Sequence, residues 1–160
     1  MSAAVGNLAG MTYERILIDP FLTAFVARLR RAVDAPNRGR IDYLDGLLRR
    51  FLEETTTRVS CAHCQTLLDA ERVLDPEGAF ARTMDLEDLV FTLGGFIHSP
   101  WLRDDPKMRI VQWRFVEALL IDIQQTPMHD CDELDMRYAD LWGHINWALR
   151  RSRARSNTYR

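Results

Sequence analysis

The sequence predicts an all-α protein, a single domain folded as an irregular bundle of about six helices. Three observations support this fold class. Apolar residues recur every three or four positions along most of the chain, which is the spacing of one helix face. No segment shows the sustained apolar–polar alternation of a half-buried strand. Asp-Pro dipeptides begin at Asp19, Asp75 and Asp105, and an Asp followed by Pro is a typical helix start.

The composition is that of one folded domain. The 160 residues are 47% hydrophobic and 28% charged, which is enough to bury a core without a metal or a disulfide. No apolar run approaches the roughly 20 residues of a membrane span, and the N-terminus lacks the features of a secretory signal. We therefore expect a cytoplasmic location and no membrane partner. Three cysteines, an odd number, do not suggest a disulfide framework.

The charge balance limits one class of function. A net charge of −2 argues against a protein that coats nucleic acid over its whole surface. Lys107 is the single lysine, and arginine supplies the rest of the basic charge apart from histidine. Arginine forks suit phosphate and carboxylate, but the bias runs through the whole chain. We attribute it to the base composition of the gene rather than to a binding site.

The first half of the chain predicts two helices after a flexible arm. Residues 1–12 are small and nearly uncharged and are expected to form that arm, ahead of a helical domain spanning 13–150. The first helix is predicted from Asp19 to about Asp34. A turn is expected at 36–39, where the sequence reads Pro-Asn-Arg-Gly. The second helix is predicted from Ile41 to about Arg58.

The stretch TTTRVSCAHCQTLL indicates a helix break. In one continuous helix, the leucines up to Leu52 would share one side, whereas Cys64 would fall on the other. A break after the β-branched threonines removes this conflict. We expect Ser60 to cap a new helix, with Cys61 as its first residue and an end near Leu74.

Three further helices are predicted in the second half. Asp85 is expected to cap the first, in which Gly94-Gly95 indicates a helix end or a close contact with another helix. The second is predicted from Pro106 to about Gln125 and is apolar on several sides, so we expect it at the centre. The last is predicted to begin near Asp132 and to carry one apolar stripe: Leu134, Tyr138, Leu141, Trp142, Ile145 and Leu149.

The cysteines suggest a zinc site as one hypothesis. Zinc prefers four thiolate or imidazole ligands, and a C-x-x-C pair often supplies half of them. Cys61 and Cys64 have this spacing, and the other half would be His129 and Cys131 in the loop before the last helix. A second C-x-x-C would be a strong signal, whereas an H-x-C in a loop is a weak one. We therefore expect no cofactor, with structural zinc as the alternative.

Cys61 and Cys64 are also candidates for a thiol-redox pair. The amides and dipole of a helix start lower the pKa of a thiol. The Cys-Ala-His-Cys string resembles that of the helical peroxidases of the carboxymuconolactone decarboxylase family. That family has a further histidine and a glutamate at positions where this chain has Leu68 and Arg49, so we do not assign the chain to it. We prefer a third interpretation, in which the cysteines pack at a helix junction.

The C-terminal end is the most polarised part of the chain. Residues 151–160 form a basic tail, and Trp147 falls off the apolar stripe of the last helix. An exposed tryptophan among arginines is typical of a contact surface. The predicted partner-binding residues are Trp147, Arg150, Arg151, Arg153 and Arg155. The other interpretation is that these cations offset the dipole of their own helix.

No catalytic motif is present: the chain lacks HExxH, a Ser-His-Asp order and a glycine-rich phosphate loop. We therefore expect a non-enzymatic helical module that binds a macromolecular partner, in the first place another protein. Its role would be that of an adaptor, an inhibitor or immunity-type protein, or an assembly subunit. Two alternatives stay open. One is a thiol-redox protein using Cys61 and Cys64, and the other is a nucleic-acid-associated protein using the C-terminal arginines.

Overall fold

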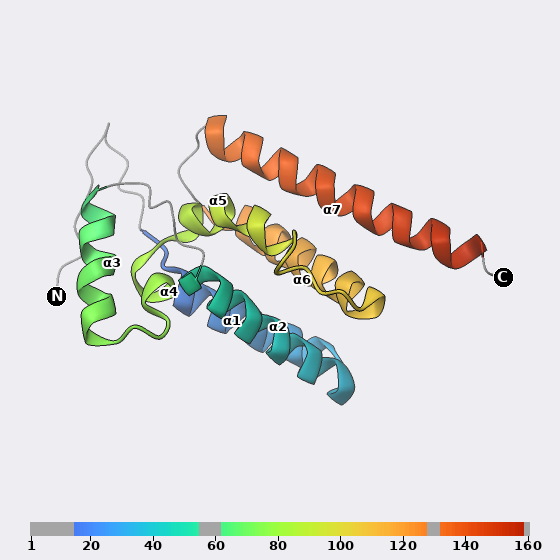
Figure 1. The fold of residues 1–160 in the computed structure, drawn as a ribbon, viewed down its shortest axis with the longest axis horizontal. Coiled ribbons are helices and arrows are strands. Elements are labelled where there is room, and N and C mark those ends of the chain that lie inside the picture. The colour runs from blue at the N-terminus through green and yellow to red at the C-terminus, as the bar shows by residue number, and fades with distance from the viewer. Residues whose placement is uncertain (1–14, 55–61, 128–131, 159–160) are drawn as a thin grey trace.

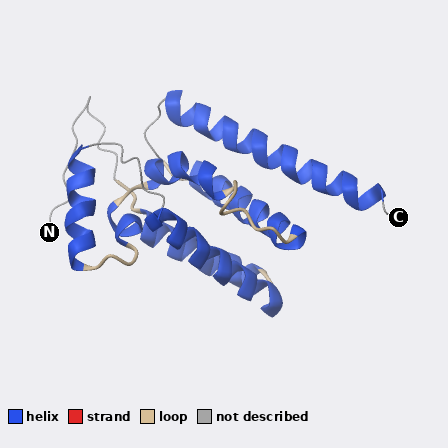
Figure 2. Ribbon diagram, in the orientation of Figure 1, coloured by secondary structure: helices blue, strands red, loops and turns tan. Residues whose placement is uncertain are grey.

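A computed structural model describes residues 15–54, 62–127 and 132–158, with side chains up to residue 154. Within these ranges the chain forms helices and no strand, which confirms the predicted all-α fold (Figure 2). The seven helices are α1 (Ile18–Ala32), α2 (Ala35–Glu54), α3 (Ala62–Leu74), α4 (Ala79–Thr83), α5 (Leu86–Phe96), α6 (Pro106–Gln124) and α7 (Asp132–Thr158). None of the described helices has both the length and the apolar character needed to cross a bilayer.

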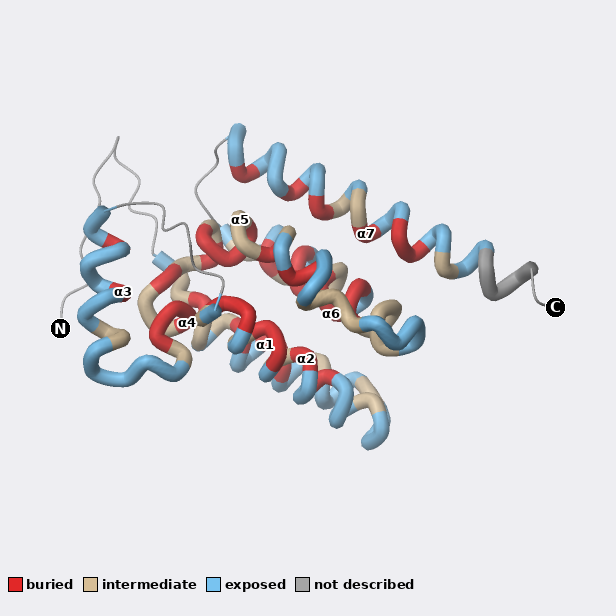
Figure 3. The backbone as a smooth tube through the Cα atoms, in the orientation of Figure 1, coloured by how far each residue is buried: buried red, intermediate tan, exposed pale blue. Residues whose placement is uncertain are grey.

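The helices pack around one hydrophobic core. Helices α1 and α2 form a pair on one side, α5 and α6 lie in the middle, and α7 runs along the opposite side (Figure 1). The short α3 stands across one end, where it packs against α4. Helix α6 supplies seven buried residues, in agreement with its predicted central position. Only the side of α7 that faces α5 and α6 is buried (Figure 3).

The predicted turn at 36–39 is wrong, because α2 already begins at Ala35. The Oδ1 atom of Asp34 accepts a hydrogen bond from the amide of Asn37 at 3.2 Å, as an N-cap side chain does. Pro36 lies in the first turn, where a missing amide hydrogen costs nothing. Residues that are typical of turns therefore start a helix here.

Asp19 was expected at the start of the first helix, as its cap. It lies instead inside the first turn of α1, one residue after Ile18, and does not cap the helix.

The predicted break between the second and third helices agrees with the described residues. Helix α2 buries Leu48 and Leu52, and α3 buries Cys64 and Leu68, so each helix has its own inward face. The predicted cap Ser60 and first residue Cys61 lie outside the described residues, as does the expected arm at 1–12.

The single-turn helix α4 was not predicted. Gly78, with a φ of +77°, precedes it in the left-handed region that glycine adopts without strain. Its first three residues, Ala79, Phe80 and Ala81, are buried. The Oε1 atom of Glu53 accepts a hydrogen bond from the Phe80 amide at 2.6 Å, which joins α4 to the end of α2. Five residues are too few to show a helical period in the sequence.

The start of the described chain fixes the junction between α4 and α5. The Ile18 amide donates to the Met84 carbonyl at 3.0 Å, and the Leu86 amide donates to the Ile16 carbonyl at 3.1 Å. The predicted cap of α5 is confirmed, because the Asp85 side chain accepts from the amides of the second and third helical residues. Asp105 caps α6 in the same way, with Pro106 directly after it.

Candidate functional site

The predicted metal and redox residues fall largely outside the described chain. Cys61, His129 and Cys131 are not among the described residues. Cys64 is described: it is only 7% exposed and belongs to the core, with the Arg15 Nη2 atom 3.7 Å from its sulfur. Among the residues that the structure describes, no three His, Cys, Asp or Glu side chains are grouped as a metal site requires.

The structure brings two of the predicted partner-binding residues together. Trp147 is 57% exposed, and the guanidinium of Arg151 lies 5.0 Å from the centre of its ring, a cation–π contact. Arg150 and Arg153 are also exposed on α7. The side chain of Arg155 lies outside the described part of the chain, although its backbone is helical.

Trp147 and Arg151 stand at the edge of a cleft of about 450 Å³. Three segments form it: residues 144–152 of α7, the first half of α6, and residues 97–102, which follow α5. Most of its lining is apolar, contributed by Ile97, Leu102, Pro106, Ile110, Trp113, Trp147 and Ala148. Its polar lining consists of His98, Ser99, Arg109, His144, Arg151 and Ser152. We call this hollow the α7 cleft.

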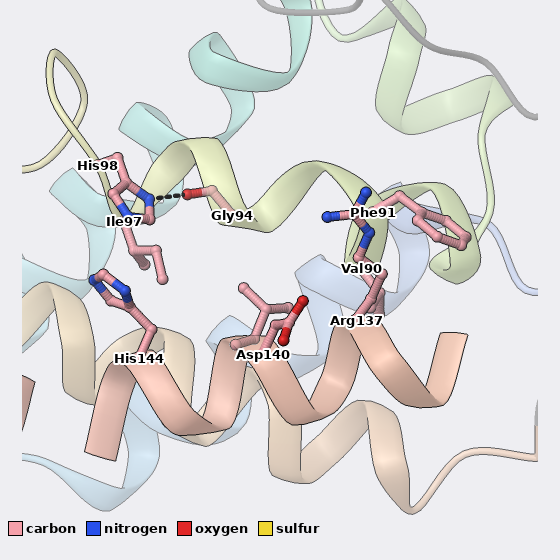
Figure 4. Close-up of a pocket in the computed structure, with 9 residues that line it drawn as sticks. Val90, Phe91, Gly94, Ile97, His98, Arg137, Asp140 and His144 are labelled. Carbon is pink, nitrogen blue, oxygen red and sulfur yellow. Dashed lines mark hydrogen bonds between the residues drawn. The ribbon is translucent and has the colours of Figure 1, made fainter. Parts of the chain in front are cut away.

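A smaller hollow of about 190 Å³ adjoins the α7 cleft between α5 and α7 (Figure 4). His98 and His144 line both hollows, and in Figure 4 they point toward each other from the segment after α5 and from α7. Arg137 and Asp140, further back on α7, supply the other charged groups of this smaller hollow. The two histidines therefore form the boundary between the hollows.

The two imidazoles form a close pair, with ring centres 4.4 Å apart. The Nδ1 atom of His98 lies 2.6 Å from the carbonyl oxygen of Gly94. Because a carbonyl oxygen can only accept, this nitrogen carries the hydrogen, and the Nε2 atom of a neutral His98 ring is left as an acceptor. Burial, and then the neighbouring His98, lower the pKa of His144 below its ordinary value. Both effects favour the neutral form of His144.

The lining of the α7 cleft is cationic and rich in donors. It contains two arginines and no Asp or Glu. Two nitrogens of Arg109 donate to main-chain carbonyls, Nε to that of Arg103 at 2.8 Å and Nη2 to that of Asp104 at 3.0 Å. The Nε1–H of Trp113 is buried and has no acceptor among the described residues. This arrangement suits an apolar group that carries acceptor atoms or negative charge.

Gln112 holds one wall of the α7 cleft in place. It is completely buried on α6, and its side-chain amide donates to the carbonyls of Phe96 and Trp101 at 2.8 and 3.2 Å. Its Oε1 atom accepts from the amide of Arg103 at 3.0 Å. These bonds span both ends of the segment that carries His98 and Ser99. The sequence signal for this role is a glutamine inside a helix that is apolar on several sides, and it was not assigned a role from the sequence.

The pairing of His98 with His144 and the role of Arg109 were not predicted either. The two histidines lie on different elements far apart in the chain, so no spacing relates them. Comparisons of the chain with known protein families, with curated proteins and with solved structures found no match.

Proposed function

We propose that this protein is a helical module that binds another protein through the α7 cleft. The observation that carries the proposal is the position of Trp147: its indole is 57% exposed, yet it borders an apolar cleft and stacks with Arg151. Tryptophan and arginine beside a pocket are the residue types that contribute most to binding energy at protein interfaces. A large apolar group that is left in water at the edge of a pocket gains free energy when a partner covers it.

Adaptors, inhibitors or immunity-type proteins, and assembly subunits all work through such a surface, and we propose a role of this kind in the cytoplasm. Arg150, Arg153 and Arg155 would surround the contact as a basic rim. Charged rim residues steer the approach of an acidic partner more than they add to affinity.

Two adjacent arginines allow a matched test. Arg151 lines the α7 cleft and Arg150 does not, although both are exposed and lie side by side in the sequence. The tagged wild-type protein should capture a stable partner from an extract of its source cells. We expect Trp147→Ala and Arg151→Glu to lose this partner and Arg150→Glu to retain it. If both cleft variants retain the partner, the binding surface lies elsewhere and the proposal is wrong.

A nucleic-acid partner is the second candidate, and one observation favours it. Arg150, Arg151 and Arg153 are exposed near the end of α7, and none forms an ion pair with a described carboxylate. Binding of a labelled oligonucleotide should then fall steeply with salt. Arg150→Glu and Arg151→Glu should weaken it equally, because phosphate contacts do not depend on the cleft. The thiol-redox alternative stays a prediction, since Cys61 lies outside the described residues.

A further inference from the structure

We propose that the α7 cleft recognises a carboxylate next to an apolar side chain in an acidic segment of the partner, and that binding adds a proton to His144, beside His98. This inference rests on the function proposed above and adds the chemistry of the ligand and its dependence on pH. It stands on three features of the cleft: an apolar floor, an excess of positive charge, and two imidazoles in contact.

The apolar floor gives the cleft its capacity for a side chain. Its volume of about 450 Å³ falls in the range of roughly 300–1,000 Å³ that is usual for pockets holding small organic groups. Trp113 and Ile110 on α6 and Ala148 and Trp147 on α7 belong to its apolar lining. Both faces of an aromatic or long aliphatic side chain that entered between these helices would be removed from water.

The charge of the lining selects the second half of the ligand. Arg109 and Arg151 contribute two fixed positive charges to the lining, which contains no Asp or Glu. Asp105 directly precedes the lining residue Pro106 but is not part of the lining. Its Oδ2 atom accepts a hydrogen bond from the amide of Met108 at 2.7 Å. A carboxylate entering the cleft would therefore meet cations and donors. Hydrogen bonds of this charge-assisted kind are stronger than neutral ones.

The histidine pair responds to this charge. In the free protein the pKa of His144 is lowered by burial and by His98. The cationic groups that line the two hollows are Arg109 from α6 and Arg137 and Arg151 from α7. Asp140 is the one acidic side chain lining either hollow among the described residues. A bound carboxylate reverses this balance and stabilises one imidazolium. The proton comes from solvent, and His144 is the ring that gains it.

The sign of the pH effect follows by linkage. Burial and His98 hold the pKa of His144 low in the free protein, and the ligand raises it. The complex therefore holds more protons than the free protein between these two pKa values, so affinity rises as pH falls through that window. One proton allows at most about a tenfold change in affinity per pH unit. A carboxylic acid ligand stays ionised there, because its pKa is near 4.3.

The test uses 3-phenylpropionate, which carries a carboxylate on an apolar group, and 3-phenylpropanamide, which has nearly the same shape without charge. Nuclear magnetic resonance titrations at pH 7.5, 6.5 and 5.5 follow the indole and imidazole signals, assigned with single Trp→Phe and His→Asn variants. We expect the propionate to shift the Trp113 and Trp147 signals and to bind about three- to tenfold more tightly at pH 5.5 than at pH 7.5. The amide should bind more weakly, with no dependence on pH.

The variants separate the proton effect from the carboxylate effect. The double variant His98→Asn/His144→Asn should still prefer the propionate but lose the dependence on pH. His63→Asn, which changes an exposed histidine on α3, should behave as the wild type. Arg151→Glu should weaken the propionate and leave the amide nearly unaffected.

Three outcomes would overturn the inference: equal affinity for the two probes, no binding of either probe at 20 mM, or unchanged affinity for the propionate across the pH range. A dependence on pH that survives in the double variant would remove the histidine pair from it. The partner-capture experiment decides the proposed function independently. Loss of the partner in Arg151→Glu with probe binding that ignores charge and pH would leave the function and reject this inference.

Discussion

At the scale of single residues, Gln112 connects the core to the α7 cleft. We expect Gln112→Met to lower the free energy of unfolding by about 2–3 kcal/mol, because it leaves the carbonyls of Phe96 and Trp101 and the amide of Arg103 without their partner. Urea unfolding measures this difference. Gln124→Met, at an exposed position on the same helix, is the control and should stay within about 0.5 kcal/mol of the wild type. Equal effects in the two variants would show that the three bonds carry no special weight.

His144 gives a residue-scale prediction for the free protein. Its pKa is lowered in the folded state, so below the ordinary histidine pKa of about 6.5 the unfolded chain binds more protons than the folded one. Stability should therefore fall as the pH is lowered from 7.5 to 5.5. His144→Asn should reduce this loss in denaturant titrations at the two pH values. A His144→Asn variant that loses as much stability as the wild type over this range would contradict the assignment.

Some residues of the site could be predicted from the sequence and others could not. Trp147 was predicted as exposed because one helical period places it off the buried stripe, and its 57% exposure confirms that. His98 and His144 could not be paired in this way, because their contact depends on how α5 packs against α7. A period within one helix carries information about which residues face the core. It carries none about which helix lies opposite.

At the scale of elements, the two glycines of α5 provide a matched pair. A Cβ at Gly95 would lie 3.0 Å from the Cζ atom of Phe51, a core ring in contact with Phe96 and Trp101. A Cβ at Gly94 would meet nothing within 4 Å. We expect Gly95→Ala to destabilise the protein by about 1–2 kcal/mol through overpacking. Gly94→Ala should stabilise it by up to about 1 kcal/mol through helix propensity.

Thermal unfolding of the two variants side by side checks this prediction, because a change of 1 kcal/mol shifts the melting temperature of a domain of this size by several degrees. If the two alanines have the same effect, the close approach of α5 to α2 at Phe51 is not a packing constraint.

Some helix boundaries were predicted correctly from the sequence and others were not, for a physical reason. Asp105 caps α6 with its side chain, whereas Asp19 in the same dipeptide context lies inside α1 and pairs instead with Arg49, at 2.5 Å between Oδ1 and Nη1. The run at 36–39 looked like a turn and begins a helix. Asp, Asn and Pro suit both a turn and the first turn of a helix. The choice between them is made by tertiary packing, here of α1 against α2.

At the scale of the whole molecule, residues 150–160 are predicted to contribute to partner binding but little to folding stability. Ala148 and Leu149 are the last buried residues of α7 among those whose side chains are described. Deleting 150–160 should therefore change the free energy of unfolding by about 0.5 kcal/mol or less. The same deletion removes Arg151 and Ser152 from the α7 cleft and should abolish partner capture. Cooperative unfolding together with retained capture would contradict this division.

The all-α fold could be predicted from the sequence because helical periodicity recurs in segment after segment, and each segment predicts its own helix independently of the others. The α7 cleft was not accessible, because it arises where three separate segments meet. Its wall depends on a buried glutamine and its boundary on two distant histidines, and neither is visible as a motif.

The exposed indole of Trp147 also makes the protein its own optical reporter. The other three tryptophans are buried or half-buried, so a quencher dissolved in water reaches Trp147 first. Iodide is an anionic quencher, and the Arg151 guanidinium over the ring would concentrate it there. A ligand in the α7 cleft would compete with iodide for this position. Fluorescence that becomes protected from iodide on mixing would thus report occupancy without a label, whatever the chemical nature of the partner.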